Sequence, residues 1–170
     1  MVPARTALVL FVTIWLQVVL FSRIEVWGAK PNVVLLFVVV AALESDAERG
    51  ALLGFVAGLS FDLLLDTPVG LSALSMVLVG WTVGGFKDSI MRTSRLVTAL
   101  LVGAASVGGT LLYALLAVVF GVTVDWERVP AIVAVVAIAN VVLTRPHRWA
   151  LRWAFGPEGR SPTRDQFIFR

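Results

Sequence analysis

The chain has 170 residues, of which 59% are apolar and only 15% charged, and its mean hydropathy is +0.93. Soluble domains are about 45–50% apolar and about 25% charged, so this composition predicts a protein whose solvent is lipid. The absence of cysteine excludes disulfides, thiolate metal sites and cysteine catalysis, and a single histidine, His147, excludes a histidine metal cluster. The net charge of +3 indicates no nucleic-acid partner, because the basic residues fall at the ends of expected helices.

Six apolar stretches predict an all-α fold, a polytopic membrane helix bundle of about six transmembrane helices. They cover residues 6–21, 33–43, 50–65, 69–86, 96–122 and 129–144. A bilayer core about 30 Å thick needs roughly 20 helical residues, and the second and third stretches reach that length only if helix continues through the polar residues 44–49. Helix formers at both ends of that segment favour continuation, and a re-entrant pair is the alternative.

Lysine and arginine predict the orientation of the bundle in the membrane. With six spans and a cytoplasmic N-terminus, eleven basic residues lie inside and only Arg23, Lys30 and Arg128 lie outside. Cytoplasmic loops carry the excess of lysine and arginine in membrane proteins. We therefore expect the N- and C-termini to be cytoplasmic.

The end of the chain predicts an additional element at the membrane surface. Arg148 and Arg152 are four residues apart, as are the two neighbouring tryptophans, so residues 145–155 are expected to form a short interfacial helix with its arginines toward anionic lipid. The bundle then covers residues 1–155, and residues 156–170 form a flexible basic cytoplasmic tail. The candidate membrane-interface residues are Trp27, Trp126, Arg148, Trp149, Arg152 and Trp153.

Glycines four residues apart lead to an aspartate in the third stretch, at Gly50, Gly54, Gly58 and Asp62. Small residues at this spacing let helix backbones approach closely. Packing within the chain is the favoured interpretation, and a groove for a partner's helix remains open. Further glycines that extend the pattern are Gly80, Gly84, Gly85, Gly103, Gly108 and Gly109.

Three polar features lie among these apolar stretches. Asp62 is expected to pair with a backbone amide or with Arg128, in preference to serving an ion pathway, because no second intramembrane acid, lysine or histidine accompanies it. Pro68 and Gly70 predict a tight turn. Asn140 is expected to form a hydrogen bond to another helix.

Catalytic chemistry is not indicated. A serine–histidine–acid triad needs a positioned histidine, and the single histidine lies in the basic end of the chain. No glycine cluster follows a strand or ends in the Gly-Lys-Ser/Thr of a phosphate loop. We therefore expect no enzyme, no cofactor and no metal.

Residues 50–74 resemble the signature of the bacterial rod shape-determining protein MreD family: a glycine-spaced helix, an aspartate, a short Pro-x-Gly turn and a helix of small residues. The residues that carry the likeness are Gly54, Gly58, Asp62, Pro68 and Gly70. Residues 140–146, an asparagine before a proline-marked end, also look similar to the family's last span. The length and the six apolar stretches match from end to end.

The resemblance implies a non-catalytic scaffold of the lateral peptidoglycan synthesis machinery (the elongasome), which helps to determine cell shape. Such a protein is a multi-pass protein of the bacterial cytoplasmic (inner) membrane. It binds the bitopic protein MreC, and through it MreB and the RodA–transpeptidase pair. The implied fold is similar to the substrate-binding subunits of energy-coupling-factor vitamin transporters.

Two other functions fit parts of the sequence. A vitamin-type uptake subunit shares the six-span plan but needs a polar-lined cavity near the outer face. The apolar stretches offer few polar side chains for such a cavity. A membrane-embedded enzyme ranks last, because no catalytic set of residues is present.

Overall fold

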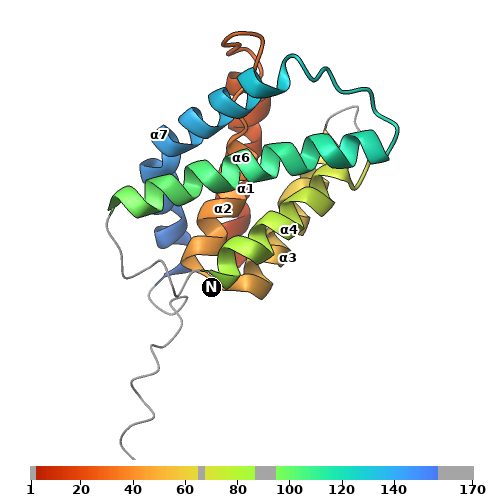
Figure 1. Cartoon of the computed structure of the whole chain (residues 1–170). Coiled ribbons are helices and arrows are strands. Elements are labelled where there is room, and N and C mark those ends of the chain that lie inside the picture. The colour runs from red at the N-terminus through yellow and green to blue at the C-terminus, as the bar shows by residue number, and fades with distance from the viewer. Residues whose placement is uncertain (1–2, 65–67, 87–94, 157–170) are drawn as a thin grey trace, which may run out of the picture.

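The computed structural model describes residues 3–64, 68–86 and 95–156, and all its regular elements are helices. This confirms the all-α class. The α-helices in the described part are α1 (Pro3–Leu16), α2 (Val33–Glu44), α3 (Ala47–Asp62), α4 (Leu71–Gly85), α6 (Arg95–Val119) and α7 (Val129–Phe155), and a π-helix, η1 (Gln17–Phe21), continues α1 (Figure 1).

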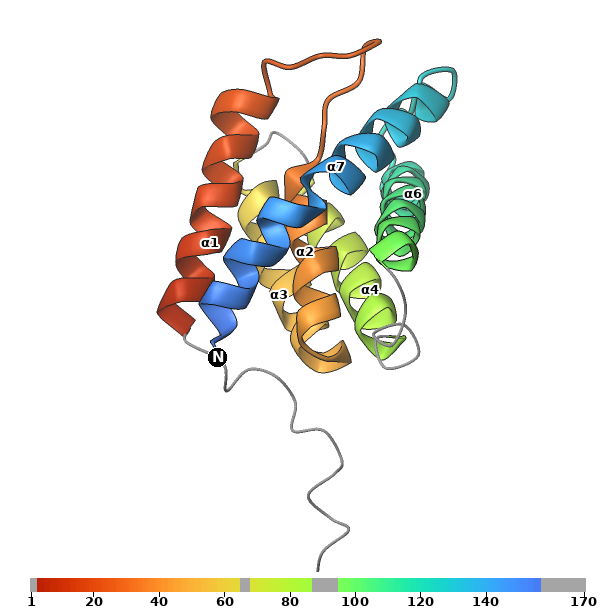
Figure 2. The same ribbon diagram turned by 90° about the vertical axis from the view of Figure 1, so that its left-hand side faces the viewer.

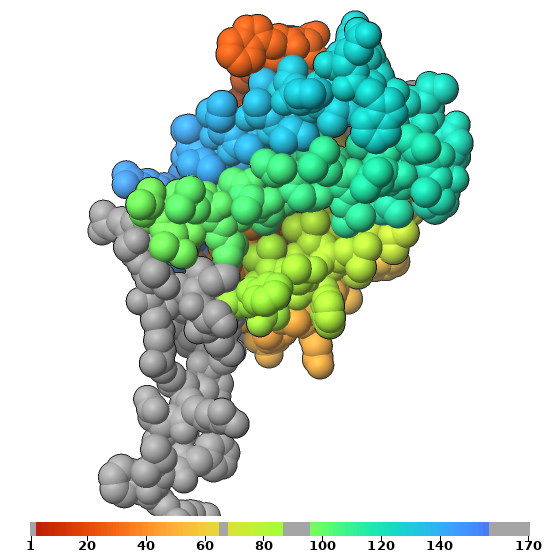
Figure 3. Space-filling view, viewed as in Figure 1, coloured from red at the N-terminus to blue at the C-terminus, as the bar shows by residue number. Residues whose placement is uncertain are grey.

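Helix α2 lies at the centre of the bundle, with the other helices around it (Figures 1 and 2). From Val33 to Leu43 each of its side chains is at most 4% exposed. A helix that is apolar on all sides is stable only when it is covered all round, which explains why this stretch takes the centre. On the face shown in Figure 3, α6 lies between α7 and α4.

Among the described residues, three helices are long and apolar enough to cross a membrane: Pro3–Phe21, Leu96–Val119 and Val129–Phe155. They leave large apolar side chains on the outside, for example Phe11, Leu100 and Val142, which are 67%, 64% and 68% exposed. A soluble protein would bury such surfaces, whereas lipid solvates them. The chain is therefore a membrane protein.

The connection between α2 and α3 differs from the expected continuous helix. Helix α2 ends at Glu44, and the Asp46 carboxylate caps α3 by accepting a hydrogen bond from the Arg49 amide at 2.9 Å. Serine and aspartate favour such caps over helix interiors, which is why the helix breaks there. The continuation is therefore wrong for α2, whereas α3 does extend back into the polar segment to Ala47.

The expected separate interfacial helix over residues 145–155 is instead the last part of α7, which continues through Pro146 without a break. At 1.5 Å per residue, 27 residues span about 40 Å, so α7 exceeds a bilayer core by about 10 Å. The Arg5 guanidinium lies 5.0 Å from the centre of the Trp153 ring, which places the start of α1 beside the end of α7 (Figure 2). Of the expected tail, residues 157–170 lie outside the described part of the chain.

Candidate functional site

Asp62 is the last residue of α3, and its buried carboxylate binds the beginning of α4. Its Oδ2 atom accepts hydrogen bonds from the amides of Gly70 at 2.9 Å and Ala73 at 3.2 Å. Both carboxylate oxygens lie 3.1 Å from the Ser72 amide. A helix N-terminus favours a negative charge and an acceptor for its free amides. Asp62 supplies both from the neighbouring helix.

The turn before α4 explains why the cap must come from elsewhere. Gly70 is the N-cap residue of α4, with φ at +101°, a conformation that side chains rarely adopt. A glycine at this position has no side chain to accept the helix amides. The Pro68 carbonyl accepts a bond from Leu71 at 3.2 Å and closes the turn. Arg128, the other partner considered for Asp62, pairs with Asp125 at 3.0 Å.

The glycines of α3 lie directly against the backbone of α4. A methyl group on Gly50 would lie 2.5 Å from the Gly80 carbonyl oxygen, and one on Gly58 would lie 2.5 Å from the Ala73 Cα atom. A methyl on Gly54 would overlap the Met76 carbonyl. Only glycine permits this approach, so the face formed by these three glycines is filled by a helix of the same chain.

Asn140 joins α7 to α6. Its Nδ2 group donates to the Ser106 hydroxyl at 2.9 Å, and both side chains are fully buried. The Oδ1 atom of the same amide has no hydrogen-bond partner in the part of the chain that the structure describes. A buried, half-satisfied amide is costly in a membrane interior, so this link contributes less than a complete pair would.

The candidate membrane-interface residues lie at the two ends of the bundle. Trp27 lies in a turn that two hydrogen bonds close: the Val26 amide donates to the Ala29 carbonyl at 2.9 Å, and the Ala29 amide donates to the Val26 carbonyl at 3.0 Å. The Trp27 side chain is 81% exposed. Trp126 lies exposed between α6 and α7, and Trp149 and Trp153 are exposed near the end of α7. Tryptophan at such places is typical of residues that anchor a protein at the headgroups.

Arg148 and Arg152 do not simply face outward. Their Nε atoms lie 2.7 and 3.1 Å from the carboxylate oxygens of Glu44, the last residue of α2. The Glu44 side chain is only 9% exposed, and a carboxylate buried that deeply needs cationic partners. The expectation that these arginines face anionic lipid stays a prediction, and the structure adds that both bind the end of the central helix.

Two polar side chains have roles that the sequence did not reveal. Gln17, in η1, donates to the Pro31 carbonyl at 2.9 Å and accepts from the Val33 amide at 2.8 Å, so it fixes the start of α2. Glu44 fixes the end of α2 through α7. The only signal in the sequence was that each of these polar residues lies within or beside an apolar stretch. That signal does not identify hydrogen-bond partners that are 14 to 108 residues away.

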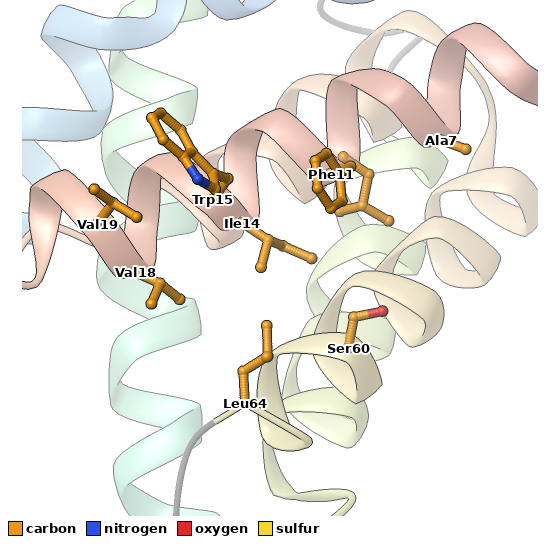
Figure 4. Close-up of a pocket in the computed structure, with 9 residues that line it drawn as sticks. Ala7, Phe11, Ile14, Trp15, Val18, Val19, Ser60 and Leu64 are labelled. Carbon is orange, nitrogen blue, oxygen red and sulfur yellow. The ribbon is translucent and has the colours of Figure 1, made fainter.

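A groove of about 440 Å³ runs along α1 and η1 beside the end of α3 (Figure 4). In Figure 4, Ile14 and Val18 point from α1 and η1 toward Leu64. Apart from Ser60, its lining is apolar: Ala7, Leu10, Phe11, Ile14, Trp15, Val18, Val19 and Leu64. The groove is therefore suited to an apolar occupant, unlike the polar-lined cavity that a vitamin site requires.

The described residues contain no group of three or more histidine, cysteine, aspartate or glutamate side chains that could hold a metal ion. The polar contacts of Asp62, Asn140 and Glu44 instead connect helices to one another. Such an arrangement can hold a bundle in one conformation and present its outer surface to lipid or to another protein.

Fold and site together define a polytopic helical membrane protein organised around a glycine-packed, aspartate-capped helical hairpin. The sequence model of one protein family, described as rod shape-determining protein MreD, matches residues 4–146, which is most of the chain. The chain belongs to this family, and the resemblance drawn from its sequence is confirmed. Membership implies a role in determining rod shape. No curated protein and no solved structure matches the chain, so the likeness to energy-coupling-factor subunits stays a prediction.

Proposed function

We propose that the protein is a non-catalytic scaffold of the lateral peptidoglycan synthesis machinery and binds an MreC-like bitopic partner, through which it reaches MreB and the RodA–transpeptidase pair. The family match over residues 4–146 carries this proposal. The geometry supports it, because the intramembrane polar groups Asp62, Asn140 and Gln17 are all engaged in joining helices.

The proposed setting is the bacterial inner membrane, with six crossings and both termini in the cytoplasm. Arg5, Arg49 and the arginines that end α7 gather at one end of the bundle, whereas Arg23, Lys30 and Arg128 belong to loops at the other. This distribution fits the excess of positive charge expected on the cytoplasmic side. The central helix α2 is short, so its crossing depends on cover from its neighbours.

The partner's single span is proposed to dock in the groove beside α1. The glycine face of α3 is already filled by α4, so it cannot receive a second helix. The α1 and η1 residues that line the groove recur at steps of three and four from Ala7 to Val19, a stripe about 18 Å long. This is the spacing with which one helix packs along another. A lipid acyl chain is the competing occupant.

A pulldown from native membranes in mild detergent, followed by mass spectrometry, tests the proposal. The wild-type chain is expected to recover a single-span protein together with wall-synthesis enzymes. A Phe11→Ala/Trp15→Ala double variant is expected to recover about tenfold less partner protein than the wild-type chain. The reason is that two exposed side chains lining the groove are removed. Trp81→Ala, which removes an equally exposed tryptophan from α4, is the matched control and should recover the partner normally.

The possible results separate the parts of the proposal. Wild-type membranes that repeatedly yield no single-span protein would contradict the scaffold function. Normal recovery by the groove variant would leave the scaffold function intact and assign the groove to lipid. Recovery of ATPase subunits in place of wall enzymes would favour a transporter subunit.

A further inference from the structure

The charged end of α7 and the beginning of α6 line a second, partly open cavity of about 600 Å³. It is separate from the groove beside α1 and has a different chemistry. Helix α6 contributes Thr98 and Ala99, and α7 contributes the rest of the lining: Val141, Thr144, Arg145, Arg148, Trp149 and Arg152. Three arginines and the Thr98 hydroxyl therefore face one hollow whose remaining wall is apolar, because the buried Thr144 hydroxyl donates its proton to the Asn140 carbonyl at 2.7 Å.

The positive charge in this cavity is only partly neutralised. Glu44 pairs with Arg148 and Arg152, which leaves one carboxylate against three guanidinium groups. Both pairs use the Nε atoms, and no hydrogen bond among the described residues occupies the Nη atoms of either arginine. Arg145 makes no ion pair within the same part of the chain. The arginines thus keep free donors of the kind that binds phosphate oxygens.

Glu44 also limits the motion of these donors. A guanidinium held through Nε presents its two NH2 groups in a fixed direction, so less conformational entropy is lost when an anion binds. The buried carboxylate therefore positions two arginines in the cavity wall as well as closing the bundle. Arg145 lies one turn before Arg148 on the same helix, on the side that can supply the third contact.

We propose that this cavity binds the phosphate-bearing headgroup of an anionic phospholipid. The arginine side chains and the Thr98 hydroxyl would hold the phosphate, and Ala99 and Val141 would contact the start of an acyl chain. Trp149, which is 76% exposed, has the character of an interfacial residue beside it. Basic pockets between transmembrane helices are a known type of site for anionic headgroups. The apolar wall favours a lipid over a free phosphate ion, and the proposal does not depend on the partner protein.

Native mass spectrometry of the delipidated full-length protein in neutral detergent tests this site. Phosphatidylglycerol is expected to bind with at least about tenfold higher affinity than phosphatidylcholine, whose headgroup carries no net charge. Arg145→Gln should weaken phosphatidylglycerol binding by about tenfold, because one charge-assisted contact is lost, and should leave thermal stability unchanged. Arg128→Gln, which removes an exposed arginine at the other end of the bundle, is the matched control.

Three results would overturn the assignment. The first is equal binding of the two lipids by the wild-type protein. The second is equal loss of binding in the Arg145 and Arg128 variants, which would indicate only a general effect of charge. The third is displacement of phosphatidylglycerol by an equal concentration of inorganic phosphate, which would assign the cavity to a free ion.

Discussion

Glycines occur in both helices of the α3–α4 hairpin and in helix α6 of the α6–α7 hairpin, but only α3–α4 uses glycine to bring its two helices together. In α3–α4, glycines of each helix lie against the backbone of the other, as Gly50 and Gly80 do. In α6–α7, a methyl on Gly103 would meet only the Val141 side chain at an ordinary 3.5 Å, and one on Gly108 would meet nothing within 4 Å. The presence of glycine therefore does not define a close contact.

The difference follows from the spacing of the glycines along each helix. Gly50, Gly54 and Gly58 repeat every four residues, and Gly80 and Gly84 do the same on the opposing helix. Residues four apart share a helix face. Gly103 and Gly108 are five apart, which rotates the second well away from the first. Only the regular spacing on both helices makes two flat, matching surfaces.

The largest effect is expected for Gly58→Leu. The atoms that the new side chain would meet belong to the backbone of Ser72 and Ala73, which cannot rotate away. The loss of unfolding free energy should therefore exceed the roughly 1–3 kcal/mol that is typical of overpacking. Size-exclusion chromatography after heating, in mild detergent, should show little folded protein.

Gly108→Leu is the matched control for this change, because the same side chain is placed at an open, exposed position of α6. It should retain the wild-type midpoint of thermal unfolding. Equal stability of the two variants would refute the claim that one hairpin depends on glycine contact and the other does not.

A smaller loss is expected when the cap of α4 is removed. Asp62→Ala leaves the amides of Gly70, Ser72 and Ala73 without their acceptor and should cost about 2–3 kcal/mol. Asp62→Asn keeps one acceptor oxygen in place and should cost about 1 kcal/mol. Unfolding titrations in sodium dodecyl sulfate can rank the variants, and an asparagine variant as unstable as the alanine variant would contradict a capping role.

The sequence predicted the helices because long apolar runs have few other solutions in lipid. It also located the hairpin, since glycine spacing, an aspartate and a Pro-x-Gly turn are local features of residues 50–74. Within that hairpin the sequence named two kinds of partner for Asp62, and only the geometry of the turn chooses backbone amides over Arg128. A local pattern can therefore predict an element and its neighbour in the chain.

Contacts between distant segments could not be predicted in the same way. The sequence predicts that Glu44 belongs to a continuing helix, whereas it ends α2 and binds arginines 104 and 108 residues further along the chain. The close packing expected of Gly85 and Gly108 is wrong, since a side chain there would meet nothing within 4 Å. Sequence spacing shows which residues share a helix face, but it does not show what covers that face or which distant side chain binds there.

The smallest effect is expected at the link between α6 and α7. Asn140→Leu loses one hydrogen bond, worth about 0.6 kcal/mol in membranes, but also removes the unpaired Oδ1 atom. The net change should stay below about 1 kcal/mol. Ser106→Ala removes the same bond yet leaves the whole Asn140 amide buried without a side-chain partner, so it should cost more, about 1–3 kcal/mol. The same detergent titration measures both variants. A larger loss of unfolding free energy in Asn140→Leu than in Ser106→Ala would contradict this argument. It would mean that the Asn140 Oδ1 atom also has a hydrogen-bond partner and that polar contacts hold α6 and α7 together about as strongly as the other hairpin is held.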